Sequence, residues 1–300
     1  MPRRILVTGA SGFLGQHCTR ALSQAGWEVV ALQRRAFDHD HIAATIQCDL
    51  LADGDITDTI RDANASHLLH LAWHDDPKDR WGSAKNLDWA AASLRLGRAF
   101  AATGGQHMTF GGSCAEYDWS GSDLREGLTP LNPSSLYGAA KASTSRLLLA
   151  AQEELNLTVA AARIFFCYGP GEPRGRLLSD LIHGLLSGEP VDCTDGLQER
   201  DYMNAADVAG ALERIADRNY GGAINVASGD AIPVRTLIET TARYIGQPNL
   251  PQFGKLKRSA SDPQRLAADV SRLKSLGFSP AYDLQRGIAE MVESIRQDMK

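Results

Sequence analysis

The stretch TGASGFLG, residues 8–15, decides the fold of this chain. Its glycines, Gly9, Gly12 and Gly15, follow the apolar run RILVT and open an amphipathic segment that extends to Ala25. In a strand-turn-helix unit the first glycine permits the tight turn, the second lets the backbone approach a pyrophosphate, and the third packs the helix on the strand. The amino terminus of the helix then faces the phosphates. The motif therefore predicts a dinucleotide-binding site at the start of the chain.

Beyond this motif, short apolar runs alternate with amphipathic segments through the first half of the chain. We predict strands at WEVVALQ, ATIQCDL, ASHLLHLAW, HMTFGGS and TVAAARIFFCYGP, and helices over about 85–103 and from Tyr137 to about Asn156. Strands that alternate with helices favour parallel pairing with right-handed crossovers. The predicted fold is therefore α/β, a Rossmann-like doubly wound parallel sheet with a smaller C-terminal substrate-binding lobe.

The pattern becomes irregular after Pro170. Further helices are predicted at 176–187, 205–217, 234–245 and 283–298. We expect residues 1–170 to form the NAD(P)-binding Rossmann domain, with part of the later chain returning to it. Residues 171–300 should form mainly the substrate-binding lobe, over the sheet edge where ligands bind in such folds.

Composition excludes several classes of partner. The net charge of −5, with 22% charged residues, gives no basic excess to attract nucleic acid or an anionic membrane. The five cysteines are odd in number and show no CxxC spacing, so neither a disulfide framework nor a metal site is predicted. No apolar run approaches the roughly 18 residues of a membrane span. We therefore expect a cytoplasmic protein with no nucleic-acid or membrane partner.

The end of the second predicted strand bears on the choice of cofactor. Gln33 occupies the position where an acidic side chain would hold the ribose 2′-hydroxyl of NAD. Arg34 and Arg35 follow it, and a guanidinium there suits the 2′-phosphate of NADP. The pattern favours NADP, used as NADPH, with NAD as the alternative. A solvated basic pair at the start of a loop would give the same sequence.

The stretch SLYGAAKAS places Tyr137 and Lys141 four residues apart, on one face of a predicted helix. A lysine beside a tyrosine stabilises the phenolate and lowers the phenol pKa from its ordinary value of about 10. Such a tyrosine can exchange a proton with a carbonyl or a hydroxyl group. A second candidate is Ser113, which the stretch FGGSCAEYD presents after two glycines.

Together these residues resemble the extended short-chain dehydrogenase/reductases of the nucleotide-sugar epimerase/dehydratase type, over essentially all 300 residues. The resemblance rests on TGASGFLG, the CDL of residues 48–50, HLAW at 70–73, Ser113, the Tyr137/Lys141 pair, RIFFCYGP at 163–170 and RDYMNAADVA at 200–209.

The resemblance implies roles for single residues. Ser113 would hydrogen-bond the substrate oxygen, Tyr137 would be the acid and base, and Lys141 would hold the nicotinamide ribose. Arg200 is similar to the family arginine that grips the sugar-nucleotide diphosphate, and Phe166 stands where many relatives carry asparagine beside that diphosphate. The other expected cofactor contacts, besides the three glycines, Tyr137, Lys141, Arg34 and Arg35, are Ser11, Phe13, Leu14, Asp49, Leu50, Leu71, Ala72, Trp73, Asn86 and Phe165.

Departures from the family patterns narrow the reaction. The 4,6-dehydratases follow the serine with Asp and Glu, but this chain has Cys114 and Ala115, and Glu116 comes one place too late and should point elsewhere. The bifunctional 3,5-epimerase/reductases use a cysteine and a histidine at the places of Ala115 and Gly171. Neither dehydration nor that epimerisation is therefore expected.

Two reactions need only Ser113, Tyr137 and Lys141. The absence of an acidic ribose partner favours NADP-dependent reduction of a nucleotide-linked 4-keto-6-deoxy sugar, with Tyr137 as proton donor. The alternative is an NAD-dependent nucleotide-sugar 4-epimerase. A reductase of a non-nucleotide carbonyl and a non-catalytic NADP-sensing protein are further alternatives. A homodimer through the two helices near 85–103 and 137–156 is also expected.

Overall fold

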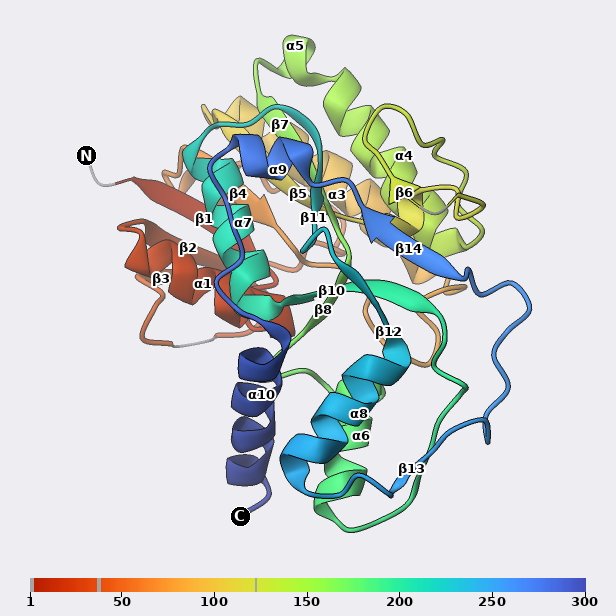
Figure 1. Cartoon of the computed structure of the whole chain (residues 1–300). Helices are drawn as coiled ribbons and strands as arrows, with labels where there is room; N and C mark the ends of the chain where they lie inside the picture. Colours follow the sequence, from red (N-terminus) through yellow and green to blue (C-terminus); the bar gives the residue numbers. More distant parts are fainter. Residues whose placement is uncertain (1–2, 37–38, 122) are drawn as a thin grey trace.

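A seven-stranded parallel sheet forms the centre of the fold in the computed structural model, which describes residues 3–36, 39–121 and 123–300 (Figure 1). Its strand order is β11-β7-β5-β4-β1-β2-β3, and every neighbouring pair is parallel. The strands are β1 (Arg4–Thr8), β2 (Glu28–Gln33), β3 (Ala44–Gln47), β4 (His67–His70), β5 (His107–Ser113), β7 (Thr158–Ile164) and β11 (Gly222–Val226). The predicted Rossmann-like α/β fold is confirmed.

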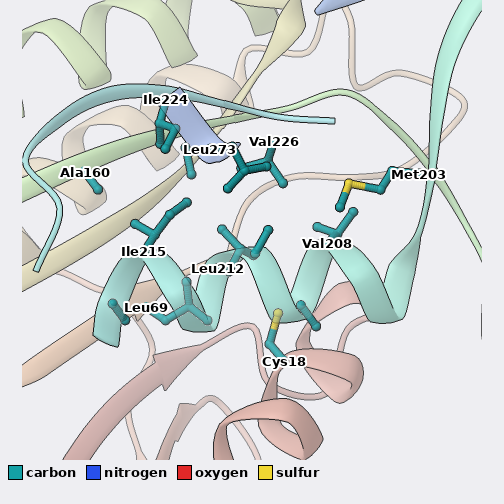
Figure 2. Close-up of a cluster of buried hydrophobic side chains, with 14 of the residues drawn as sticks. Cys18, Leu69, Ala160, Met203, Val208, Leu212, Ile215, Ile224, Val226 and Leu273 are labelled. Atoms are coloured by element: carbon teal, nitrogen blue, oxygen red, sulfur yellow. The ribbon is translucent and has the colours of Figure 1, made fainter. Parts of the chain in front are cut away.

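Helices cover both faces of this sheet. One face carries α1 (Phe13–Gln24) and α7 (Ala205–Asp217), and the other carries α2 (Thr57–Arg61), α3 (Lys85–Ala102) and α4 (Leu136–Ala150), which α5 (Gln152–Leu155) follows. Figure 2 shows Val208, Leu212 and Ile215 of α7 packed toward the sheet, with Cys18 of α1 beside them. None of the helices within the described ranges is long and apolar enough to cross a lipid bilayer.

Three further helices share a separate hydrophobic cluster. They are α6 (Leu177–Leu186), α8 (Val234–Ile245) and α10 (Leu284–Asp298), which lie together below the sheet in Figure 1. In α8 the buried residues Val234, Leu237, Ile238 and Thr241 recur at the three- and four-residue spacing of one helix face. These helices therefore have an apolar interior of their own.

A smaller sheet lies between the two groups of helices. Its central strand β10 pairs with β8, β12 and β14, and β14 also pairs with β6. The remaining elements are β6 (Asp123–Leu124), β8 (Phe166–Tyr168), β10 (Glu199–Asn204), β12 (Ala231–Pro233), β14 (Arg265–Ala268), the pair β9 (Val191–Asp192) and β13 (Pro251–Gln252), helix α9 (Ser271–Ser275) and the 3-10 turn Cys114–Glu116.

One predicted strand divides in the structure. The run TVAAARIFFCYGP is two strands, β7 and β8, separated at Phe165, whose N–H donates to the carbonyl of Val226 at 3.0 Å. Val226 ends β11, so the neighbour of β7 stops there, and the next three residues pair with Tyr202–Asn204 of β10 instead. The chain thus passes directly from the large sheet to the small one.

Candidate active site

A cavity of about 510 Å³ opens at the carboxyl ends of β1, β4 and β5. In the sheet, β2 and β3 lie on one side of β1, and β4 and the strands after it lie on the other. The strand order therefore reverses at β1. Ligands bind at such reversal points in open α/β sheets. The cavity brings together most of the residues predicted from the sequence: Gly9, Gly12, Phe13, Leu14, Gly15, Leu71, Ala72, Trp73, Ser113, Tyr137, Lys141, Phe165 and Phe166.

The glycine motif forms a backbone cradle on the cavity wall. A Cβ atom on Gly15 would lie 1.9 Å from the carbonyl oxygen of Gly9, so only glycine lets α1 start this close to the end of β1. No side chain caps the amino terminus of α1. Its first N–H groups therefore remain available to an anion, which the helix dipole also favours. This geometry fits the pyrophosphate of a dinucleotide.

The end of β2 presents an amide where the cofactor ribose is expected. Gln33 is only 9% exposed, and its Nε2 has no hydrogen-bond partner among the described residues. Arg34 and Arg35, by contrast, follow the end of the strand and are exposed. A buried amide without a partner is poised to donate to a ribose hydroxyl, since leaving it unpaired costs free energy.

The other predicted residues lie outside the lining of this cavity: Ser11, Arg34, Arg35, Asp49, Leu50, Asn86 and Arg200. Asn86 is buried, and its side-chain oxygen accepts the indole N–H of Trp73 at 2.8 Å. Its amide also donates to the carbonyl of Arg80 at 2.7 Å. Asn86 thus acts on the cavity indirectly, by orienting Trp73 and the loop of residues 71–82.

Helix α4 brings Tyr137 beside Ser113. The Ser135 side chain caps α4 by accepting the N–H of Gly138 at 3.1 Å. A Cβ atom on Gly138 would lie 2.3 Å from the carbonyl oxygen of Ala115, so the helix can approach the end of β5 only with glycine there. Burial raises the pKa of the Tyr137 phenol, and a hydrogen bond with Ser113 acts in the opposite direction. The phenol pKa therefore lies above its ordinary value, not below it as the sequence predicted.

Lys141 contacts other groups on the cavity wall. Its Nζ donates to the carbonyl of Gly111 at 2.6 Å and lies 3.9 Å from the centroid of the Trp73 ring. Burial lowers the pKa of Lys141 to about 7. The spacing of four residues puts lysine and tyrosine on one helix face, but removing both from water disfavours their charged forms. Burial is the largest effect on the phenol pKa, and the charged groups that act on it are Asp75, Cys114 and Arg80.

Glu116 points into the core, as expected, and fixes Ser113 from behind. One carboxylate oxygen accepts the backbone N–H of Ser113 at 2.9 Å and the hydroxyl of Ser145 at 3.2 Å. The other accepts from Nε of Arg163 at 2.9 Å, and the two side chains are 0% and 4% exposed. Cys114 beside them is buried, which raises the pKa of its thiol to about 12, so it is a packed residue and no base.

The loop of residues 71–82 contributes several lining residues to the cavity. Its Asp75 carboxylate bonds Arg80 at 2.9 Å and Arg176, another lining residue, at 2.6 Å. The Trp81 ring stands edge-on to Tyr137, with ring centroids 5.5 Å apart and planes at 80°. Sequence reasoning missed the Asp75–Arg176 bridge, because 101 residues separate the partners and neither belongs to a motif.

A second cavity, of about 240 Å³, adjoins the first and shares Phe166, Leu177 and Tyr202 with it. Arg200 lies in this second cavity, where its Nη2 bonds the Asp262 carboxylate at 2.5 Å. Asp262 was also missed from the sequence. It stands in a loop 62 residues after Arg200, and no local pattern marks it.

Comparisons with known proteins give one consistent family. The model of the NAD-dependent epimerase/dehydratase family matches residues 5–227. A UDP-glucose 4-epimerase from Azospirillum brasilense is 28% identical, over 99% of this chain and 93% of that protein. The structure of MoeE5 in complex with UDP-glucuronic acid and NAD is 32% identical, with a TM-score of 0.85 over 98% of this chain and 99% of that one. A UDP-N-acetylglucosamine 4-epimerase from Methanobrevibacter ruminantium M1 is 25% identical, with a TM-score of 0.88 over 99% of each chain.

These likenesses correct one prediction and confirm another. The predicted NADP-dependent 4-ketoreductase is wrong, because several relatives are named 4-epimerases and a similar structure holds NAD. That prediction gave weight to Arg34 and Arg35, which prove to be exposed, and neglected the buried amide of Gln33. The resemblance to nucleotide-sugar epimerases and dehydratases is confirmed. The chain therefore belongs to the NAD-dependent epimerase/dehydratase family.

Proposed function

We propose that this protein is an NAD-dependent 4-epimerase of a nucleotide-linked sugar, with UDP-linked hexoses as its substrates. The observation that carries the proposal is the continuity of the two cavities. Ser113, Tyr137 and Lys141 lie on the wall of the first, Arg200 lies in the second, and the two share lining residues. MoeE5, the relative at 32% identity, is described with UDP-glucuronic acid and with UDP-glucose, each together with NAD, which supports this choice.

The residues around the glycine motif suit NAD. The uncapped amino terminus of α1 would hold the pyrophosphate, and the unpaired amide of Gln33 would hold the adenosine ribose. When bound, NAD would take a hydride from carbon 4 of the sugar and return it. Trp73 and Lys141 line the wall on which the nicotinamide end would lie.

Side chains of the protein would take up and return the proton of the 4-hydroxyl group of the sugar. Tyr137 would take that proton as the C–H bond at carbon 4 breaks, and would return it once the hydride has reached the opposite face of the sugar. The Ser113 hydroxyl, which is hydrogen-bonded to the Tyr137 phenol, would hold the 4-oxygen of the sugar in place. Glu116 fixes Ser113 by accepting its backbone N–H. No net oxidation results, because the substrate regains the hydride and the proton that it gave up.

The second cavity would hold the nucleotide. The Arg200 guanidinium can bind a diphosphate with two parallel hydrogen bonds, and the Asp262 carboxylate can accept from ribose hydroxyls. Because Phe166 and Tyr202 line both cavities, the sugar and its nucleotide would lie on either side of these two rings.

An assay without added reductant tests the proposal. The purified protein is incubated with UDP-glucose, UDP-glucuronic acid or UDP-N-acetylglucosamine, and the 4-epimer is measured by chromatography. We expect interconversion of at least one pair, with the amount of bound NAD unchanged. Turnover only of 4-keto sugars, with one reduced cofactor consumed for each product molecule, would contradict the proposal.

Replacing Gln33 with leucine should weaken NAD binding by about tenfold, since one hydrogen bond in a desolvated site is lost. The matched control is the Arg34→Ala/Arg35→Ala double variant, whose side chains are exposed and should leave NAD binding nearly unchanged. Both affinities are measured by fluorescence titration of nucleotide-stripped protein with NADH. A loss confined to the arginine variant would instead assign the ribose site to those side chains.

We propose further that residues 1–170 form the cofactor domain and residues 171–300 mainly the substrate lobe, which the separate cluster of α6, α8 and α10 supports. All five cysteines are unpaired thiols, in keeping with a reducing cytoplasm.

The outer faces of α3 and α4 expose Leu87 and Leu147, at 57% and 54%, which supports a homodimer contact through these helices.

A further inference from the structure

Strand β10 and Gln198, the residue before it, place three side chains on the lining of the second cavity. Successive side chains of a strand point to opposite faces, so Gln198, Arg200 and Tyr202 share one face, and all three line this cavity. Asp201 points the other way, to Ser228, and Met203 points to the core between the large sheet and α7. Arg200 and Tyr202 have partners on the cavity wall, while Gln198 does not.

The backbone of Gln198 is hydrogen-bonded, but its side-chain oxygen is not. It is 9% exposed, and its carbonyl oxygen accepts the N–H of Val234 at 2.9 Å, which fixes the backbone. Its side-chain oxygen Oε1 has no hydrogen-bond partner in the part of the chain that the structure describes. A buried amide oxygen without a donor costs free energy, so such groups in native proteins usually have a function. A molecule bound in the cavity can supply the donor that this oxygen lacks.

The remaining walls indicate the shape of that molecule. The rings of Phe166 and Tyr202 lie 5.6 Å apart between centroids and are tilted by 52°, and the apolar side chains of Val234, Ile238 and Leu256 complete the lining. These surfaces suit a flat ring with apolar faces. The charged groups of the cavity are the Arg200–Asp262 pair and Asp192. The cavity thus combines apolar walls, one unpaired acceptor and an arginine that can bind phosphate.

A nucleobase has this combination of flat apolar faces and a polar edge. We infer that Gln198 reads the base of the substrate, with its Oε1 accepting the ring N3–H of uracil or thymine. The inference rests on the proposed function for the class of ligand, a nucleotide sugar, and adds the residue that recognises the base. Gln198 would then set specificity at a point far from the reacting carbon, where neither Tyr137 nor the cofactor has contact.

Two nucleotides that differ at a single atom test the inference. UDP and 3-methyl-UDP share phosphates and ribose, but the second lacks the N3–H that Gln198 would accept. Isothermal titration should show the unaltered protein binding UDP about tenfold more tightly than 3-methyl-UDP. In Gln198→Leu, UDP should bind about tenfold more weakly, and the preference between the two nucleotides should fall to about one.

Leu197→Ala is the matched control, because Leu197 precedes Gln198, is exposed and lies outside the cavity lining. It should keep the full preference for UDP, and thermal unfolding checks that every variant is folded. A preference that survives in Gln198→Leu, or equal binding of the two nucleotides to the unaltered protein, overturns the inference. UDP binding with the expected preference but without epimerase activity would leave the inference standing and reject the proposed function. A protein that binds neither nucleotide rejects both.

Discussion

Replacing Tyr137 with phenylalanine is expected to lower kcat for 4-epimerisation by about 10²–10⁴-fold, the usual contribution of a positioned acid or base. The variant keeps the ring that stands against Trp81 but loses the hydroxyl that bonds Ser113. Two neighbours of Ser113 are poorly suited to replace the phenol: burial raises the pKa of the Cys114 thiol to about 12, and Glu116 is bound to Arg163 in the core. The epimerase assay at substrate saturation measures the effect.

Binding should separate from turnover in this variant. The affinities for NAD and UDP should stay within about twofold of the unaltered protein, because the phenol acts chiefly in the proton transfer. Tyr244→Phe provides the control, since Tyr244 is exposed on α8 and its hydroxyl donates to the Glu293 carboxylate at 3.3 Å, outside both cavities. If Tyr137→Phe retained most of its activity, the proton would have to travel by another route and the mechanism would fail.

Replacing Arg163 with leucine should lower the free energy of unfolding by about 3–5 kcal/mol, because it leaves the buried Glu116 carboxylate without its counter-charge. The pair is almost wholly removed from water, and Arg163 also donates to the hydroxyl of Tyr117 at 3.0 Å. Urea denaturation followed by circular dichroism measures the loss. A second effect should follow: because Glu116 holds the backbone N–H of Ser113, kcat should also fall.

Two further variants serve as controls for the loss of stability in Arg163→Leu. In Arg163→Leu/Glu116→Gln the unpaired charge is gone, so part of the lost stability should return. Arg286→Leu removes an exposed arginine that lies 3.4 Å from Glu290, and should cost far less, since solvent screens such pairs. Equal losses for Arg163→Leu and Arg286→Leu would mean that the buried pair contributes no more than a surface contact.

The fold was predictable wherever the signal was local. The glycine motif of residues 8–15 correctly predicted β1 and α1, and the alternation of apolar runs with amphipathic segments predicted the parallel sheet. Both signals lie within short stretches of neighbouring residues. The division of the predicted strand at Phe165 could not be foreseen, because it depends on where β11 ends, some sixty residues later. Which strands pair depends on the packing of the whole sheet, so the partners of a strand cannot be predicted from its own apolar run.

The candidate site shows the same limit. Ser113, Tyr137 and Lys141 were named from motifs, and the structure places all three on one cavity wall. The direction of the Tyr137 pKa was wrong, because spacing reveals which groups are neighbours but not how much water surrounds them. Gln198 could have been found, since it precedes Arg200 by the two-residue period of a strand. Asp262 could not, because it reaches Arg200 from a loop far along the chain.

The passage from β7 to β8 also sets a length. Ile164 pairs in register with Ser113, and two residues later Phe166 pairs in register with Tyr202, on the strand that Gln198 precedes. The backbone that carries the reacting end and the backbone that carries the base are thus joined by a single residue, Phe165, with little slack. On the proposed function, this connection fixes the distance between the site for carbon 4 of the sugar and the site for the base. We therefore expect a sugar carried on one phosphate instead of two to bind more weakly, because its base and its fourth carbon lie closer together.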